Sequence, residues 1–203
     1  GLATVRAILS YTGHPFKVYK DGIWQDIYGW MDSRVNDYKG IVGKRRLANV
    51  EVPDLELFPE RYNVKDEVKF QAGLELPILH NTMVTMAYLA KKGLVKSWAP
   101  LAKTIVSTSN FFLPFGSSAG AMEIKIKGTF EDKQRTLTWT LYAPNGNGPY
   151  IPTLSTIILA KKLIQEEALS PGANPCVGML KIADFDGYFA DLDIYHQVTE
   201  SSH

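Results

Sequence analysis

Two alternating runs of residues, 122–127 and 136–141, constrain the fold of this chain most strongly. In each run every second residue is apolar, and the polar turn Asp132-Lys133-Gln134 lies between the runs. Successive side chains of a strand point to opposite faces, so each run has one apolar and one polar face. This pattern predicts an antiparallel sheet with one side open to solvent or lightly covered. Thr136, Thr138 and Thr140 lie on the polar face, where a second copy of the chain could pair.

A second hairpin is predicted near the N-terminus. Residues 16–20 and 23–28 flank Asp21-Gly22, a dipeptide that supplies the positive φ angles of a tight hairpin turn. Hydrophobic periodicity predicts helices over 2–12, 77–92, 95–109, 152–167 and 183–191. Strands are predicted over 43–52, 67–72, 177–180 and 193–198, and irregular segments over 29–40 and 53–64. Helices and antiparallel hairpins mixed in this way indicate one α+β domain over 1–203, with a largely antiparallel or mixed sheet packed with helices.

Composition excludes several classes of protein. The 203 residues hold 22 basic and 21 acidic residues, a net charge of +1, so no global field favours a nucleic-acid partner. No apolar run approaches the roughly 20 residues of a transmembrane helix. The chain does not open on a basic-then-apolar leader, so we expect no signal peptide. A single cysteine permits no internal disulfide, which favours a reducing, cytoplasmic location. Cys176 precedes an apolar run and is interpreted as a buried small hydrophobic residue.

The pattern of the first residues favours the interpretation that this chain is a piece of a longer protein. Leu2, Val5, Ile8 and Leu9 recur at helical spacing, but no capping residue precedes them. A processed start or a cloning artefact is the alternative.

Motifs for cofactor chemistry are missing from this sequence. It has no G-x-G-x-x-G and no Walker lysine pattern, and the small residues 116–120 stand between a predicted helix and a strand, the wrong order for a dinucleotide loop. None of the four histidines forms an H-x-x-x-H pair, so we expect no metal site. We therefore expect neither a metal nor a bound coenzyme in this chain.

A few polar residues could still form a binding site. In the basic strand, Arg45 points away from Lys44 and Arg46, and this run could bind a carboxylate or phosphate or could simply be a solvated edge. His80, in the first turn of the helix at Pro77, is either a hydrogen-bonded or surface histidine or a cleft acid/base group. Residues 145–152, with two glycines and two prolines before a helix, form either an anion site or a rigid turn.

Several short motifs occur in an order typical of a known family. They are Asp21-Gly22 with Trp24, Val52-Pro53-Asp54-Leu55, Leu57-Phe58-Pro59, Arg61-Tyr62, Phe70-Gln71-Ala72-Gly73-Leu74-Glu75-Leu76-Pro77, Gly148-Pro149-Tyr150-Ile151-Pro152, Ile158-Leu159-Ala160-Lys161-Lys162-Leu163 and Pro175-Cys176-Val177-Gly178-Met179-Leu180. Together they resemble the C-terminal part of bacterial saccharopine dehydrogenase-like oxidoreductases. The resemblance implies a parent protein with an N-terminal Rossmann domain that binds NAD or NADP, and a second α+β domain that covers the active-site cleft and often mediates dimerisation.

On this resemblance, the chain is expected to be the substrate-binding and dimerisation domain, inactive as an isolated fragment. Its partners would be the parent's Rossmann domain, a second copy and a small-molecule substrate. No catalytic residue can be transferred, because none of the family's maps onto a motif here. The candidate substrate-binding residues are Gln71, Glu75, His80, Tyr150, Arg45 and Arg46. The alternative is a non-catalytic module for a small molecule or lipid, with an apolar pocket lined by Trp24, Trp30, Trp98, Trp139 and Phe111-Phe112.

Overall fold

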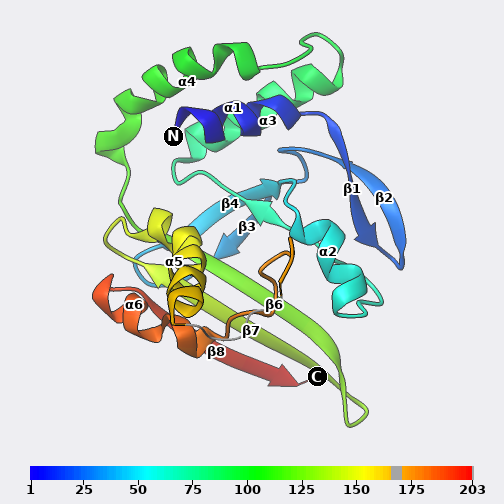
Figure 1. Cartoon of the computed structure of the whole chain (residues 1–203). Coiled ribbons are helices and arrows are strands. Elements are labelled where there is room, and N and C mark those ends of the chain that lie inside the picture. Colours follow the sequence, from blue (N-terminus) through cyan, green and yellow to red (C-terminus); the bar gives the residue numbers. More distant parts are fainter. Residues whose placement is uncertain (166–170, 203) are drawn as a thin grey trace. The chain divides into compact units, whose positions relative to one another are not determined.

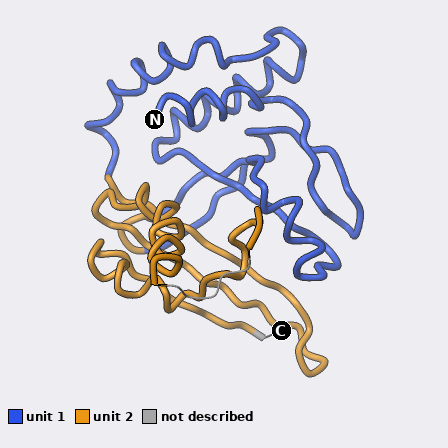
Figure 2. Tube along the Cα trace, viewed as in Figure 1, with its two compact units in different colours: residues 1–39, 43–117 blue, residues 40–42, 118–203 orange. Residues whose placement is uncertain are grey.

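A computed structural model describes residues 1–165 and 171–202 of the chain (Figure 1). It divides into two compact units (Figure 2). Unit 1 comprises residues 1–39 and 43–117, and unit 2 comprises 40–42 and the described residues from 118 onward. Compactness alone does not make a unit an independent domain, so the expectation of a single domain stays a prediction. The helices and antiparallel sheets confirm the α+β fold class.

Unit 1 contains two small antiparallel sheets and four α-helices. One sheet is the hairpin β1-β2, and the other has the strand order β3-β4-β5. The elements of unit 1 are α1 (Leu2–Tyr11), β1 (Pro15–Lys20), β2 (Ile23–Tyr28), β3 (Arg34–Asp37), β4 (Lys44–Asn49), α2 (Asp54–Arg61), β5 (Gln71–Ala72), α3 (Pro77–Lys91), the 3-10 turn η1 (Ala99–Leu101), α4 (Ala102–Ser109) and the 3-10 segment η2 (Asn110–Phe115).

The core of unit 1 forms where α1, α3 and α4 meet β4 (Figure 1). Leu9, Ala48, Ala87 and Ala102 are each at most 1% exposed. Small side chains at three of these positions let helix and strand backbones approach closely. Along α3 the buried residues are His80, Met83, Met86, Ala87 and Ala90, whereas Ile78 is 56% exposed.

The predicted β1-β2 hairpin is confirmed. Lys20 pairs with Ile23, which leaves Asp21 and Gly22 as the two-residue turn. Their φ angles are 54° and 75°, the positive values that a tight hairpin turn requires. Phe16 and Val18 on β1 pack against Leu55 of α2 to form a second small core.

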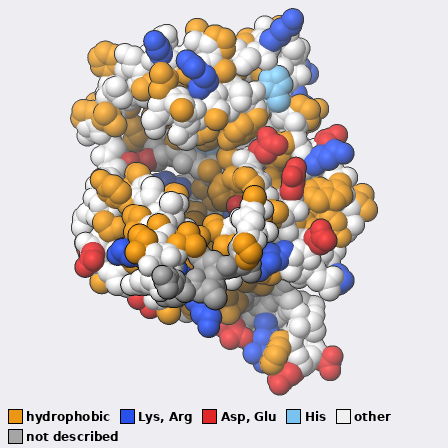
Figure 3. Space-filling view, viewed as in Figure 1, with side chains coloured by type: hydrophobic (Ala, Val, Ile, Leu, Met, Phe, Trp, Pro, Cys, Tyr) orange, Lys and Arg blue, Asp and Glu red, His pale blue; other side chains and the backbone are white. Residues whose placement is uncertain are grey.

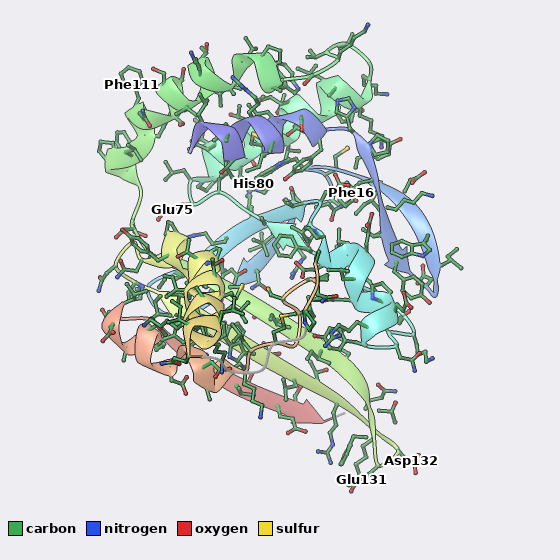
Figure 4. All side chains as sticks on the ribbon, viewed as in Figure 1. Phe16, Glu75, His80, Phe111, Glu131 and Asp132 are labelled. Carbon is green, nitrogen blue, oxygen red and sulfur yellow. The ribbon has the colours of Figure 1, made fainter. Side chains whose placement is uncertain are left out.

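Unit 2 is a three-stranded antiparallel sheet with helices on part of one face. Its strand order is β6-β7-β8, and its core joins Leu141 of β7 to Leu154 and Ile158 of α5 and to Phe189 of α6. The elements of unit 2 are β6 (Gly120–Phe130), β7 (Lys133–Ala143), η3 (Gly148–Tyr150), α5 (Ile151–Ile164), η4 (Ile182–Phe185), α6 (Asp186–Asp191) and β8 (Tyr195–Ser202). The alternating runs of the sequence are therefore paired strands, but the turn is Glu131-Asp132, at the tip of the hairpin, rather than 132–134 (Figure 4).

Four sequence-based predictions are wrong. Segment 53–64 contains α2, which the sequence pattern does not indicate because Pro59 lies inside the helix. The burial of Leu55 stabilises this helix. Segment 29–40 contains β3, whose one apolar residue, Val35, gives no alternation. Segment 177–180 is not a strand. Cys176 is exposed, because residues 176–179 form a turn, closed by the Met179 amide on the Cys176 carbonyl, instead of entering a sheet.

Several boundaries differ from the prediction as well. Strands β4 and β5 are shorter than the segments 43–52 and 67–72. The last residues of the helix predicted over 152–167 lie outside the described residues. No helix in the described part of the chain is long and apolar enough to cross a membrane.

The close approach of residue 73 to β4 gives a testable consequence. A Cβ built on Gly73 would overlap the carbonyl oxygen of Arg46 and lie 3.1 Å from Leu47 Cδ2. We expect Gly73→Ala to lower the free energy of unfolding by about 2–3 kcal/mol, because the strand backbone must move. Gly128→Ala is the matched control, since nothing lies within 4 Å of a Cβ there. Urea denaturation of both variants measures the difference, and equal losses would contradict this account.

Candidate functional site

Five of the six candidate site residues lie in unit 1, around β4, β5 and the first turn of α3. Arg45 and Arg46 are on β4, Gln71 is on β5, Glu75 follows β5, and His80 is in α3. The Asn49–Gln71 pairing of β4 with β5 fixes this neighbourhood. Glu75 and His80 are labelled in Figure 4.

Gln71 is the centre of a hydrogen-bonded network. Its Oε1 accepts a hydrogen bond from Arg34 Nε. Its Nε2 donates to Asn49 Oδ1 at 3.1 Å and to the Asp32 carbonyl at 3.3 Å. Asn49, which is 1% exposed, donates in turn to Asp32 Oδ2 at 2.8 Å. Since both ends of the Gln71 amide are occupied, Gln71 positions its neighbours and is poorly suited to bind a ligand directly.

Glu75 is likewise held by hydrogen bonds within the protein. Its Oε1 accepts hydrogen bonds from Arg45 at 3.3 Å and from the Ser117 amide and hydroxyl at 2.7 and 2.6 Å. The side chains of Arg45 and Glu75 are 19% and 30% exposed, so water screens this ion pair only in part. Glu75 therefore ties the end of unit 1 to β4 and neutralises Arg45.

His80 is fully buried, yet it contacts an exposed serine. Its Nε2 lies 2.9 Å from Ser33 Oγ, and its ring meets Trp30 edge-on with 5.8 Å between centroids. Nδ1 has no hydrogen-bond partner. An unpaired buried N–H is rarer than an unpaired lone pair, which favours the tautomer in which Nε2–H donates to Ser33 Oγ. The hydroxyl hydrogen of Ser33 is then available to an acceptor outside.

The backbone on the N-terminal side of Ser33 has an unusual conformation. Trp30 and Asp32 have φ angles of 61° and 55°, although neither is glycine and Trp30 is only 2% exposed. Bulky residues rarely adopt this left-handed region, and such strain occurs frequently at functional sites. The Trp30 amide donates to the Asn49 carbonyl, and the Asn49 amide donates to the Met31 carbonyl, which holds the segment in place.

Arg46 is the cation of this site with the most unused donors. Its NH1 donates to Asn81 Oδ1 at 2.9 Å, and among the described residues it forms no ion pair. Burial lowers the pKa of His80 below its ordinary value of 6.5, and the nearby charge of Arg46 lowers it further. His80 is therefore neutral at pH 7, and the charge that acts on it is that of Arg46.

Tyr150, the sixth candidate, belongs to unit 2. It lies in η3, is 56% exposed, and its carbonyl accepts a hydrogen bond from Thr153 at 2.6 Å. The glycine-rich loop before it is fastened by side-chain amides, Asn145 to Asp193 and Asn147 to the Leu192 carbonyl. These contacts correspond to the rigid turn rather than to an open anion site.

Sequence reasoning missed several residues that the fold brings to the cluster. Asp32, Ser33 and Arg34 stood in a segment expected to be irregular, and Asn81 stood on a helix with no distinguishing pattern. One signal was present, because Asn49 is a polar residue inside the short run 47–50, whose other three residues are apolar. A buried asparagine requires hydrogen-bond partners, which points to a polar network around it.

The aromatic residues considered for an apolar pocket do not form a common lining. Trp30 and Trp98 pack in or against the core of unit 1, Trp139 packs against that of unit 2, and Phe111 is 78% exposed. An open pocket of about 350 Å³ beside Tyr19 and Trp24 is lined also by Glu56, Glu60 and Lys65, which suits no purely apolar ligand.

No group of three or more histidine, cysteine, aspartate or glutamate residues that could hold a metal ion occurs within the described ranges 1–165 and 171–202. No protein-family model matches this chain, and no curated protein matches it significantly.

The depressed pKa of His80 predicts how stability depends on pH. The unfolded chain protonates this group near 6.5, whereas the folded chain does so only at lower pH. Between the two values the unfolded state binds more protons, so the stability contributed by neutral His80 is complete above pH 6.5 and is lost as the pH falls through the folded pKa. We expect His80→Gln to flatten the loss of unfolding free energy between pH 7.5 and 5.5.

Urea denaturation across this pH range measures the effect. The matched control is His14→Gln, because His14 Nε2 likewise lies 2.9 Å from one oxygen atom, in this case the carbonyl oxygen of Lys96. Comparison with this control separates the loss of His80 from the loss of any one histidine. A slope unchanged in His80→Gln would show that His80 is not the titrating group.

Proposed function

We propose that this chain is the substrate-binding and dimerisation domain of a saccharopine dehydrogenase-like, NAD(P)-dependent oxidoreductase, and that Arg46 and Ser33 anchor a carboxylate of its substrate. The sequence motifs support the family. The observation that carries the site is the guanidinium of Arg46, whose hydrogen-bonding partner is a neutral amide. A guanidinium with unused donors is well matched to a carboxylate.

The surroundings of Arg46 favour an anion. The first turn of α3 has no acidic residue, so the positive end of its dipole is not neutralised there. Neutral His80 donates Nε2–H to Ser33 Oγ, which leaves the hydroxyl hydrogen of Ser33 as a further donor. The nearest carboxylate after β5, that of Glu75, is held by Arg45 and Ser117 and not by Arg46.

In the parent protein, the coenzyme would be held by a Rossmann domain and would exchange hydride with a carbon of the substrate. The role of this chain would be to bind and orient the substrate and to exclude water. The isolated 203 residues should then have no dehydrogenase activity, and NAD or NADP would belong to the parent protein.

Loss of the Arg46 guanidinium should weaken carboxylate binding. A charge-assisted hydrogen bond contributes about 1.5–3 kcal/mol, so Arg46→Gln should weaken the binding of a small carboxylate at least about ten-fold. Titration of the chain with acetate, succinate and glutamate, followed by amide chemical shifts, should show perturbations at Ser33, Arg46 and Asn81. Arg135→Gln is the matched control, because Arg135 is already paired with Glu200 at 3.0 Å in unit 2.

Two results would contradict the proposal. Amide chemical-shift perturbations that persist in Arg46→Gln would show that the carboxylate does not bind at Arg46. Micromolar binding of NADH or NADPH to the chain alone, measured by calorimetry, would contradict the assignment of the coenzyme to another domain.

The sheet of unit 2 supports the dimerisation role, but on the face opposite to the expected one. Thr140 is 5% exposed and Thr136 and Thr138 are half-buried. On the other face, beyond the part that α5 and α6 cover, Ile124, Ile126 and Val198 are 48–59% exposed. Exposed apolar surface of this kind is typical of a protein interface.

Charges on this apolar face should therefore dissociate the dimer. Ile126→Glu and Val198→Glu would each bury a carboxylate in the interface, weakening association at least about ten-fold. Thr136→Glu, on the opposite face, is the control and should remain dimeric. Sedimentation equilibrium measures the association, and a wild-type chain that is monomeric at high concentration would overturn this part of the proposal.

A further inference from the structure

We infer that the outer edge of unit 1 formed by α4 and its flanking segments binds the surface of an anionic lipid bilayer. This inference is independent of the proposed function. We call this surface the α4 ridge and define it by its exposed apolar residues Leu94, Leu101, Phe111, Leu113 and Phe115 and its exposed basic residues Lys92, Lys96 and Lys103.

The apolar residues of the ridge are unusually exposed. Phe111, Leu113 and Phe115 are 78%, 71% and 75% exposed, and all three lie in the short segment η2. Leu94, 72% exposed, lies in the connection between α3 and η1 at the other end of the ridge (Figure 1). Single exposed apolar residues are ordinary, but several large ones on one edge mark a surface that meets an apolar partner. The label in Figure 4 places Phe111 at the outside of unit 1.

The local charge identifies the kind of partner. Between Glu75 and Glu123 the sequence has four lysines and no acidic residue, and it has no charged residue at all from 104 to 122. Hydrophobic side chains and basic side chains occur together over α4 in the space-filling view (Figure 3). Lysines beside bulky apolar side chains, without acidic residues, are the composition that binds anionic lipid headgroups while the apolar groups enter the acyl boundary.

The same charges argue against a second copy as the occupant. A symmetric dimer through this surface would bring the lysines of both copies together with no acidic residue of the ridge to compensate them. The inward side of α4 is already used, since Ala102 is 0% exposed and Ile105 packs on the core. The outward side carries Lys103, Thr104, Ser107 and Thr108, which suit the polar headgroup layer.

Vesicle co-sedimentation of the 203-residue chain tests the inference. We expect binding to vesicles of 70% phosphatidylcholine and 30% phosphatidylserine, much weaker binding to pure phosphatidylcholine, and a decrease with added salt. Each lysine near such a surface contributes about five-fold in affinity, so Lys96→Gln with Lys103→Gln should weaken binding about 30-fold. Phe111→Ser with Phe115→Ser should weaken it at least about 100-fold, because both side chains would otherwise leave water.

Controls separate a lipid surface from other causes. Phe130→Ser removes a 57% exposed phenylalanine from unit 2, and Lys133→Gln removes an exposed lysine there, so both should bind as the wild type does. Circular dichroism should show unchanged folding, since all substituted side chains are exposed. The inference is overturned if wild type does not bind the phosphatidylserine vesicles or if ridge and control variants bind equally. It is also overturned if Phe111→Ser converts a dimer to monomers, which would make the ridge an interface between copies.

Discussion

The candidate site depends on the close approach of residues 71–75 to β4. Strand β5 has only two residues, Gln71 and Ala72, so its two backbone pairings alone would hold it weakly. Gly73 allows the chain to continue directly against the Arg46 carbonyl, where any side chain would collide. This approach brings Gln71 to Asn49 and Glu75 to Arg45, and it sets the point at which α3 begins and carries His80 behind Ser33.

Within the cluster, buried polar groups and groups with unused donors have different roles. Asn49, Gln71 and Glu75 have their hydrogen-bonding capacity satisfied inside the protein, so they hold the backbone in place. Arg46 and Ser33 lie at the exposed side, and in the proposed site they would keep donors for a ligand. A binding site needs both classes, because a donor whose support moves cannot select a ligand by geometry.

Elements with strong periodicity or explicit turn chemistry could be predicted from the sequence, and elements held by tertiary contacts could not. The Asp21-Gly22 turn, the paired strands β6 and β7 and helix α3 follow from local patterns. Helix α2 contains Pro59, and β3 has a single apolar residue, so neither has a local sequence signature. Both elements are stabilised by tertiary contacts within unit 1. The basic pair and His80 were found as types of residue, but Ser33 and Asn81 became visible only when the fold placed them beside those groups.

A net charge of +1 conceals how unevenly charge is distributed. The 47 residues from 76 to 122 contain four lysines and no carboxylate, so the remaining residues must carry an acidic excess. Charged groups farther apart than about 10 Å are largely screened from one another at physiological salt. A partner therefore meets the local charge of the surface that it approaches, and near-neutrality of the whole chain does not weaken a basic ridge or an arginine site. Segment 76–122 therefore provides no carboxylate to Arg46, beside the first turn of α3, or to the lysines around α4. At both surfaces of unit 1 this segment leaves the positive charge without neutralisation.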